Sequence, residues 1–115
     1  MSDIDKRAHR RLALEIDAWV CEAISGVWQP IRMLDISVGG AGLVVPQQLD
    51  VGAHYAFQFQ IPDQAERIHM IGRVMYCVPH SYLGGFRTGV KISKIEARDH
   101  AAIARYTGDP LPPVE

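Results

Sequence analysis

The stretch "LALEIDAWV", residues 12–20, alternates apolar side chains with other side chains at a period of two. One side of the alternation carries Leu12, Leu14, Ile16, Ala18 and Val20. Successive side chains of a β-strand point to opposite faces, so this period predicts a half-buried strand rather than a helix. The fold is therefore expected to begin with a strand that presents one face to a core.

The same period recurs along most of the chain. It predicts further strands at residues 31–37, 41–45, 55–61, 66–78 and 86–92, with "SGVWQP" (25–30) as a turn. The apolar positions of the 55–61 strand are Tyr55, Phe57, Phe59 and Ile61. Those of the 66–78 strand are Ile68, Met70, Val74, Tyr76 and Val78, and those of the last strand are Phe86, Thr88, Val90 and Ile92. These sets are expected to face one core.

After Ile92 the apolar period becomes helical. Ser93 and Glu96 have the spacing of a capping box, in which each side chain bonds a free amide of the first helical turn. The apolar residues that then recur at helical spacing are Ile95, Ala102, Ile103 and Tyr106. Gly108 and Pro110 predict where this helix ends.

Six strands followed by one helix predict a mainly β fold. The expected architecture is a small six-stranded antiparallel β-barrel with a C-terminal α-helix packed on it or across one opening. Residues 1–10 are polar and aperiodic, and we expect a flexible N-terminal arm there. Residues 11–108 would form the barrel and helix, and residues 109–115 a loose tail.

Composition narrows the classes of function. The chain has 115 residues, 48% of them hydrophobic, and a net charge of −1, which disfavours broad binding of nucleic acid or membranes. Cys21 and Cys77 have no zinc-ligand spacing and are expected to be buried thiols. No apolar run approaches a membrane span, and the N-terminus lacks the apolar region of a signal peptide. A soluble cytoplasmic protein is expected.

Two short segments contain side chains that are suited to binding a ligand. "KRAHRR" (6–11) places the guanidiniums of Arg7 and Arg11 four residues apart, and each is a planar fork of donors that can bind phosphate or the O6/N7 edge of guanine. "DISVGGAGL" (35–43) adds the carboxylate of Asp35, the hydroxyl of Ser37 and a glycine, Gly40, at DxSxxG spacing. A carboxylate accepts from base N–H groups, and glycine lets a ligand approach the backbone. Together they describe a site for a guanine nucleotide.

This pairing of RxxxR with DxSxxG resembles the PilZ family of cyclic di-GMP receptors. The segments "LDVGAHYAFQFQIP", "IGRVMYCV" and "GGFRTGVKIS" also look like the family, in the expected order. The resemblance implies a six-stranded barrel that binds one molecule of cyclic di-GMP or a stacked pair. Arg7 and Arg11 would contact phosphates and guanines, Asp35 and Ser37 would read a guanine, and Gly40 would keep the turn open.

Arg10 is an extra cation that can assist binding or simply be solvated. A protein of this kind is expected to be a non-enzymatic receptor, with no cofactor and no metal, that relays the signal to an unidentified partner protein. Ligand binding would order the N-terminal arm, whose like charges repel when no ligand is present.

Three other interpretations remain open. Asp35 and Ser37 can be local turn formers that bond backbone amides, in a PilZ-like protein-interaction module that binds no ligand. A small barrel can also bind RNA or single strands, although the net charge of −1 disfavours this. Trp19, Trp28 and Tyr76 can stack on a base, but packing is the expected role. The five histidines are scattered and Ser37 has no positioned base, so a zinc site or an enzyme is not expected.

Overall fold

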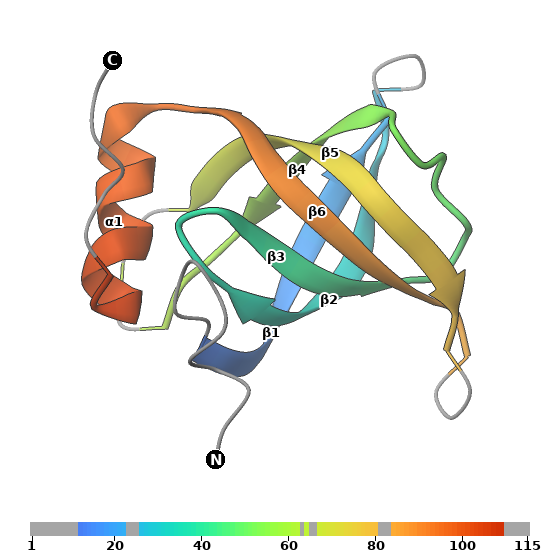
Figure 1. Ribbon diagram of the computed structural model, residues 1–115, viewed down its shortest axis with the longest axis horizontal. Helices are drawn as coiled ribbons and strands as arrows, with labels where there is room; N and C mark the ends of the chain where they lie inside the picture. The colour runs from blue at the N-terminus through green and yellow to red at the C-terminus, as the bar shows by residue number, and fades with distance from the viewer. Residues whose placement is uncertain (1–11, 23–25, 63, 65–66, 81–83, 110–115) are drawn as a thin grey trace.

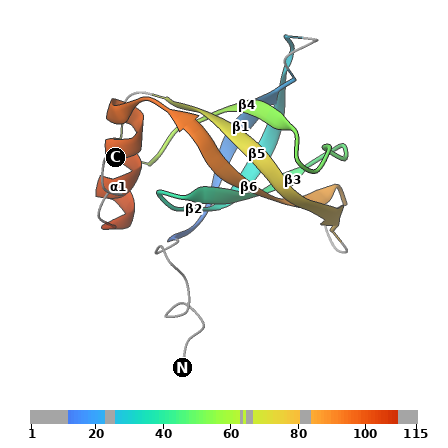
Figure 2. The same ribbon diagram turned by 45° about the horizontal axis from the view of Figure 1, so that its top comes forward.

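The chain folds into a closed barrel with a helix across one end (Figures 1 and 2). The computed structural model describes residues 12–22, 26–62, 64, 67–80 and 84–109. Its elements are β1 (Leu12–Cys21), β2 (Trp28–Ile36), β3 (Gly40–Val45), β4 (His54–Phe59), β5 (Ile68–Pro79), β6 (Phe86–Ile95) and α1 (Ala97–Thr107). All strand pairs are antiparallel, in the order β1-β2-β3-β6-β5-β4, and β1 pairs with β4 to close the barrel. The predicted fold class is confirmed.

The barrel interior is the hydrophobic core. Phe57, Phe59 and Ile61 are fully buried, as the alternation over 55–61 predicts. Other fully buried side chains come from every side of the barrel and from the helix, and include Met33, Ile36, Leu43, Thr88 and Ile103. Burying a side chain of this size stabilises the fold by about 1.5–3 kcal/mol.

The first strand follows its predicted faces where its side chains are described. Ala18 and Val20 are buried, and Ile16 packs against the core. Trp19 lies on the outer face, where the guanidinium of Arg67 sits 4.2 Å from its ring centre. Trp19 therefore packs against Arg67 on the surface of the barrel, which agrees with the predicted packing role.

In β5 the prediction is wrong beyond Val74. The pairing of β5 with β6 shifts between Val74 and Tyr76, which inserts an extra residue into β5. A bulge of this kind exchanges the two faces of the strand that follows it. Tyr76 and Val78, predicted to face the core, are 42% and 48% exposed, whereas Cys77 is buried.

The predicted element boundaries near residues 28 and 93 also need correction. β2 begins at Trp28, so the second half of the predicted turn at 25–30 is strand. β6 continues to Ile95 and includes Ser93, whose hydroxyl donates to the carbonyl oxygen of Ile71 at 3.1 Å. Glu96 is the N-cap of α1 but makes no side-chain capping bond, so the predicted capping box is absent. Lys94 and Ile95 pair with β5 before the helix begins, and Ser93 is the extra residue at a shift in this pairing.

The helix α1 covers one end of the barrel, at the left in Figure 1. It buries Ala102 and Ile103, and its first turn carries Asp99, which is only 4% exposed. The Asp99 carboxylate accepts a hydrogen bond from the backbone N–H of His69 on β5 at 3.2 Å. At the other end, Gly108 adopts a left-handed conformation (φ 77°) and its N–H donates to Ala104. The helix therefore ends where the sequence predicts.

We predict that Asp99→Ala lowers the free energy of unfolding by about 1–3 kcal/mol, because the N–H of His69 would lose its buried acceptor. Asp99→Asn keeps an amide oxygen at that position and should cost less. Urea denaturation monitored by circular dichroism measures both variants. Asp50→Ala, which removes an exposed carboxylate, is the control, and equal stability of Asp99→Ala and this control would contradict the prediction.

Candidate functional site

The glycine-rich stretch forms the turn between β2 and β3, and Ser37 closes this turn. The Oγ of Ser37 accepts hydrogen bonds from the backbone N–H groups of Gly39 and Gly40, both at 3.1 Å. Its hydroxyl also lies 3.3 Å from the carbonyl oxygen of Gly40, to which it donates. Ser37 is only 2% exposed. We refer to residues 37–40 as the site turn.

The site turn is fixed from two sides. The backbone N–H of Ile92 on β6 donates to the carbonyl oxygen of Gly39 at 2.9 Å. From α1, the Nε2 of His100 lies 2.7 Å from the carbonyl oxygen of Val38. A carbonyl oxygen only accepts, so Nε2 is the donor in this bond. The turn is thus tied to both the last strand and the helix.

Gly40 has a packing reason to be glycine. A Cβ atom at this position would collide with the carbonyl oxygen of Val90 on β6, because the two backbones approach closely here. Gly40 pairs with Lys91 at the start of β3. The small residue is therefore required by the barrel itself, whatever else the turn contacts.

Asp35 lies two residues before the site turn, in β2. Its Oδ1 accepts a hydrogen bond from the backbone N–H of Gly42 at 3.0 Å. The carboxylate occupies the space above Gly42, where a Cβ atom would lie 2.9 Å from Oδ2. An ionised carboxylate has about four acceptor positions on its two oxygens. Asp35 is half-buried on the barrel surface.

The structure brings Asp35, Ser37 and Gly40 together, and both side chains bond backbone amides as the local-turn interpretation expects. Arg7, Arg10 and Arg11 lie outside the described residues. β1 begins immediately after Arg11, and its first two residues, Leu12 and Ala13, pair with Ile36 and Asp35. The backbone that follows the RxxxR segment therefore runs beside the DxSxxG segment.

Several cations near the site come from strands that sequence reasoning did not connect with it. Lys91 pairs with Gly40 and also with Arg73 of β5. Arg87 pairs with Val44, which in turn pairs with Arg32 of β2. Only the register of β6 against β3 reveals these neighbours, because Lys91 and Arg87 lie about fifty residues from Asp35 in the chain.

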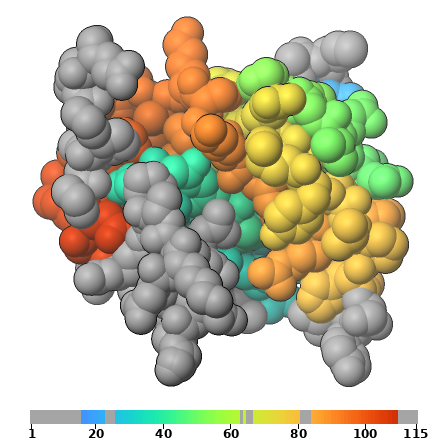
Figure 3. Space-filling view, viewed as in Figure 1, coloured from blue at the N-terminus to red at the C-terminus, as the bar shows by residue number. Residues whose placement is uncertain are grey.

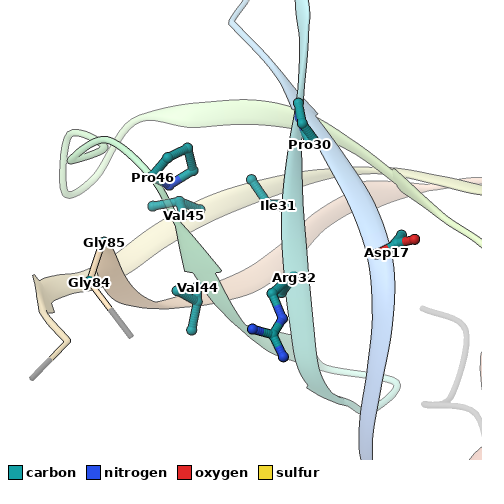
Figure 4. Close-up of a pocket in the computed structure, with 9 residues that line it drawn as sticks. All are labelled: Asp17, Pro30, Ile31, Arg32, Val44, Val45, Pro46, Gly84 and Gly85. Carbon is teal, nitrogen blue, oxygen red and sulfur yellow. The ribbon is translucent and has the colours of Figure 1, made fainter. Parts of the chain in front are cut away.

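Two hollows flank this part of the barrel. One, of about 510 Å³, adjoins the site turn and is lined by Val38, Gly39, Lys91, Ile92, Ser93, Lys94, Ile95 and His100. The other, of about 400 Å³, lies over the outer face of β2 and β3 (Figure 4). There the side chains of Arg32 and Val44 lie between the two strands, and Gly84 and Gly85 border the hollow. The first hollow is lined by the cations Lys91 and Lys94, and the second by charges of both signs, Arg32 and Asp17.

The described ranges give little support for a metal site or for a membrane-spanning helix. These residues contain no group of three His, Cys, Asp or Glu side chains placed to hold a metal ion. Cys21 and Cys77 are free and buried, as predicted. In the same part of the chain, no helix is long and apolar enough to cross a membrane.

A family model described as the PilZ domain matches residues 5–109. The chain belongs to the PilZ domain family. This family consists of cyclic di-GMP receptors, and its domains are generally non-catalytic. The matched range includes every strand and the helix of the structure, together with Arg7, Arg11 and the site turn.

Several solved structures have a similar fold. The Bacillus subtilis inhibitor of motility MotI/DgrA has a TM-score of 0.75 and 18% identity, over 89% of this chain and 49% of that one. The PilZ domain of Escherichia coli YcgR with cyclic di-GMP has a TM-score of 0.73 and 13% identity, over 90% and 89% of the two chains. K. pneumonia MrkH in its cyclic di-GMP complex has a TM-score of 0.69 and 14% identity, over 86% and 49%.

The chain therefore spans about half the length of MotI/DgrA and MrkH, and most of the YcgR domain. At these identities the likeness establishes the fold alone. No curated protein matches the sequence.

We predict that Ser37→Ala lowers the free energy of unfolding by about 1–3 kcal/mol, because the N–H groups of Gly39 and Gly40 would lose a buried acceptor. Asp35→Asn keeps an oxygen for the N–H of Gly42 and should remain close to wild type. Ser93→Ala, which removes an exposed hydroxyl, is the matched control. Chemical denaturation measures all three, and a Ser37→Ala variant as stable as this control would show that the hydroxyl does not hold the turn.

Proposed function

We propose that this PilZ domain is a non-catalytic receptor that binds cyclic di-GMP through Arg7, Arg11, Asp35, Ser37 and Gly40, with Arg10 as an additional cation. The observation that carries the proposal is the register of β1 with β2. Leu12, the residue after Arg11, pairs with Ile36, between Asp35 and Ser37. The DxSxxG half of the motif therefore lies beside the strand that begins one residue after Arg11, although the two halves are about thirty residues apart in the chain.

The residue types suit this ligand. Cyclic di-GMP carries two phosphate charges, which the guanidinium forks of Arg7 and Arg11 can bind with charge-assisted hydrogen bonds. The Asp35 carboxylate can accept from the N1–H and N2–H₂ edge of a guanine while Oδ1 keeps its bond to Gly42. Adenine has no N1–H and no amino group at C2, so Asp35 favours guanine.

We extend the proposal to signalling. Residues 1–10 act as an arm that the ligand draws onto the barrel, residues 11–108 form the body, and residues 109–115 form a tail. Lys6, Arg7, Arg10 and Arg11 repel one another, and a dianionic ligand removes that repulsion. The ordered arm and the ligand together form the surface that a partner protein recognises.

One observation favours an alternative, a PilZ-like interaction module that binds no ligand. Asp35, Ser37 and Gly40 each have a role within the free protein, as the acceptor for Gly42, the acceptor for the site turn and the close contact with β6. Selection for folding alone can therefore retain the DxSxxG half of the motif. The arginines of the RxxxR half lie outside the described residues, and substituting them distinguishes the two functions.

We predict that Arg7→Ala and Arg11→Ala each weaken cyclic di-GMP binding roughly tenfold to a hundredfold or more, because a lost charge-assisted contact costs about 1.5–3 kcal/mol. Isothermal titration calorimetry measures the affinity. Arg105→Ala removes an exposed arginine at the end of α1 and is the matched control. Cyclic di-AMP, with the same backbone charge, should bind far more weakly to the wild-type protein.

Two results would contradict this assignment. Unchanged affinity in both single mutants would remove Arg7 and Arg11 from the site, and equal affinity for the two cyclic dinucleotides would remove Asp35 as the guanine reader. A wild-type protein that binds neither ligand would favour the interaction module.

We predict that ligand orders the arm. Amide hydrogen exchange with and without cyclic di-GMP should show residues 5–12 gaining protection, along with residues 35–42. The central strands β4 and β5 should change little, because their amides are already paired within the barrel. An arm that is equally protected in both states, or unprotected at saturation, would eliminate the relay mechanism while leaving ligand binding itself intact.

A further inference from the structure

The peptide unit between Val38 and Gly39, in the site turn, is held at both of its ends. Its carbonyl oxygen, on Val38, lies 2.7 Å from the Nε2 of His100 on α1. Its N–H, on Gly39, donates to the Oγ of Ser37 at 3.1 Å. A peptide unit is planar and rigid, so holding its oxygen also fixes the direction in which its N–H points. The imidazole of His100 therefore acts, through one peptide plane, on a bond that Ser37 accepts.

The next peptide unit of the turn is held in a similar way, but by backbone. The carbonyl oxygen of Gly39 accepts from the N–H of Ile92 on β6 at 2.9 Å, and the N–H of Gly40 donates to the Ser37 Oγ at 3.1 Å. Two successive N–H groups thus converge on one oxygen. Of the two outer bonds that orient these peptide units, the one from His100 is made by a side chain, so a substitution can remove it.

Two features of the turn would let the peptide between Val38 and Gly39 rotate if the bond from His100 were lost. Gly39 has no Cβ atom, so its φ angle is not confined to the negative range and a rotated peptide has little steric cost. A hollow of about 510 Å³ adjoins the turn, and Val38, Gly39 and His100 all line it. The orientation of this peptide therefore depends on its hydrogen bonds more than on steric exclusion.

The position of His100 is itself fixed by the start of α1. Its backbone N–H donates to the carbonyl oxygen of Glu96 at 2.9 Å. The preceding residue, Asp99, is buried and accepts from the backbone N–H of His69 on β5. Figures 1 and 2 show this helix next to the turn between β2 and β3, and in Figure 3 the teal surface of that region meets the orange surface of β6. The helix therefore presents the imidazole to the turn from an anchored position.

We propose that His100 is a positioning residue for the ligand site. Its Nε2–H holds the peptide between Val38 and Gly39 so that the N–H of Gly39 stays bonded to Ser37. This bond keeps the Ser37 oxygen in the position from which it reads a guanine. The inference rests on the proposed function, in which Ser37 contacts cyclic di-GMP. It assigns part of the ligand affinity to a helix residue outside both the RxxxR and the DxSxxG segments.

Two other roles for His100 make different predictions. If the bond only attaches α1 to the barrel, loss of the imidazole lowers the stability but leaves the ligand affinity of the folded protein unchanged. If the imidazole contacts the ligand from the adjoining hollow, the affinity falls while the turn of the free protein stays as it is. The test therefore measures the ligand affinity and the free turn separately.

The first measurement is calorimetric titration with cyclic di-GMP. His100→Leu keeps most of the side-chain volume but has no donor, so we expect binding roughly threefold to tenfold weaker, as for the loss of one hydrogen bond. His100→Gln ends in an amide that can donate to the same carbonyl oxygen, and it should stay within about twofold of wild type. Ile103→Val loosens the buried face of α1 but keeps the imidazole. It is the matched control and should bind as wild type does.

The second measurement is amide hydrogen exchange of Gly39 and Gly40 in the free protein, followed by nuclear magnetic resonance. Both amides should exchange faster in His100→Leu than in wild type, and His100→Gln should restore their protection. Ring nitrogen spectra of the wild type, which do not depend on any variant folding, should show a proton on the Nε2 of His100 with and without ligand.

Unchanged affinity of His100→Leu, an equal loss in Ile103→Val, unchanged exchange of Gly39, or a ring without a proton on Nε2 would overturn this inference alone. Absence of cyclic di-GMP binding to the wild-type protein would instead overturn the proposed function, and the exchange of Gly39 would still test whether His100 holds the turn.

Discussion

Backbone pairing of β1 on both of its edges is the constraint on which this structure depends. Ala18, Val20 and Cys21 pair with β2 on one side and with β4 on the other, and this double pairing closes the barrel. Closure surrounds the core formed by residues such as Phe57 and Met33. The same strand begins beside Asp35. One set of hydrogen bonds therefore holds both the core and the geometry of the candidate site.

Sequence reasoning succeeded where side chains alternate without interruption. Phe57, Phe59 and Ile61 are buried as predicted, and so is Val90, because an unbroken period of two fixes the face of each residue. It failed at Tyr76 and Val78, where one extra residue in β5 exchanges the faces, and no side-chain pattern reveals such a bulge. It also failed at Ser93, whose spacing to Glu96 fits a helix cap, whereas the residue lies within β6, between Ile92 and Lys94, which pair with β5.

Some residues of the candidate site could likewise be predicted from the sequence, and others could not. The spacing of Asp35, Ser37 and Gly40 indicated that they act together, and the structure adds what each one holds in the free protein. Arg87 and Lys91 were not connected with the site, because their proximity arises from the register between strands distant in the chain. Asp35 and Ser37 can stabilise the turn and also bind a ligand. Their hydrogen bonds to backbone amides hold their side-chain oxygens in place before a ligand binds.

The hydrogen bond from His100 to the carbonyl oxygen of Val38 joins α1 to the site turn over 62 positions in the chain. Val38 is almost fully buried and the bond is short, so the turn cannot move outward without breaking the bond or carrying the helix with it. Two surfaces on different parts of the barrel are thereby mechanically joined. Binding at the turn and binding at the helix can be coupled through this bond, and by thermodynamic linkage each event would then change the affinity of the other by the same factor.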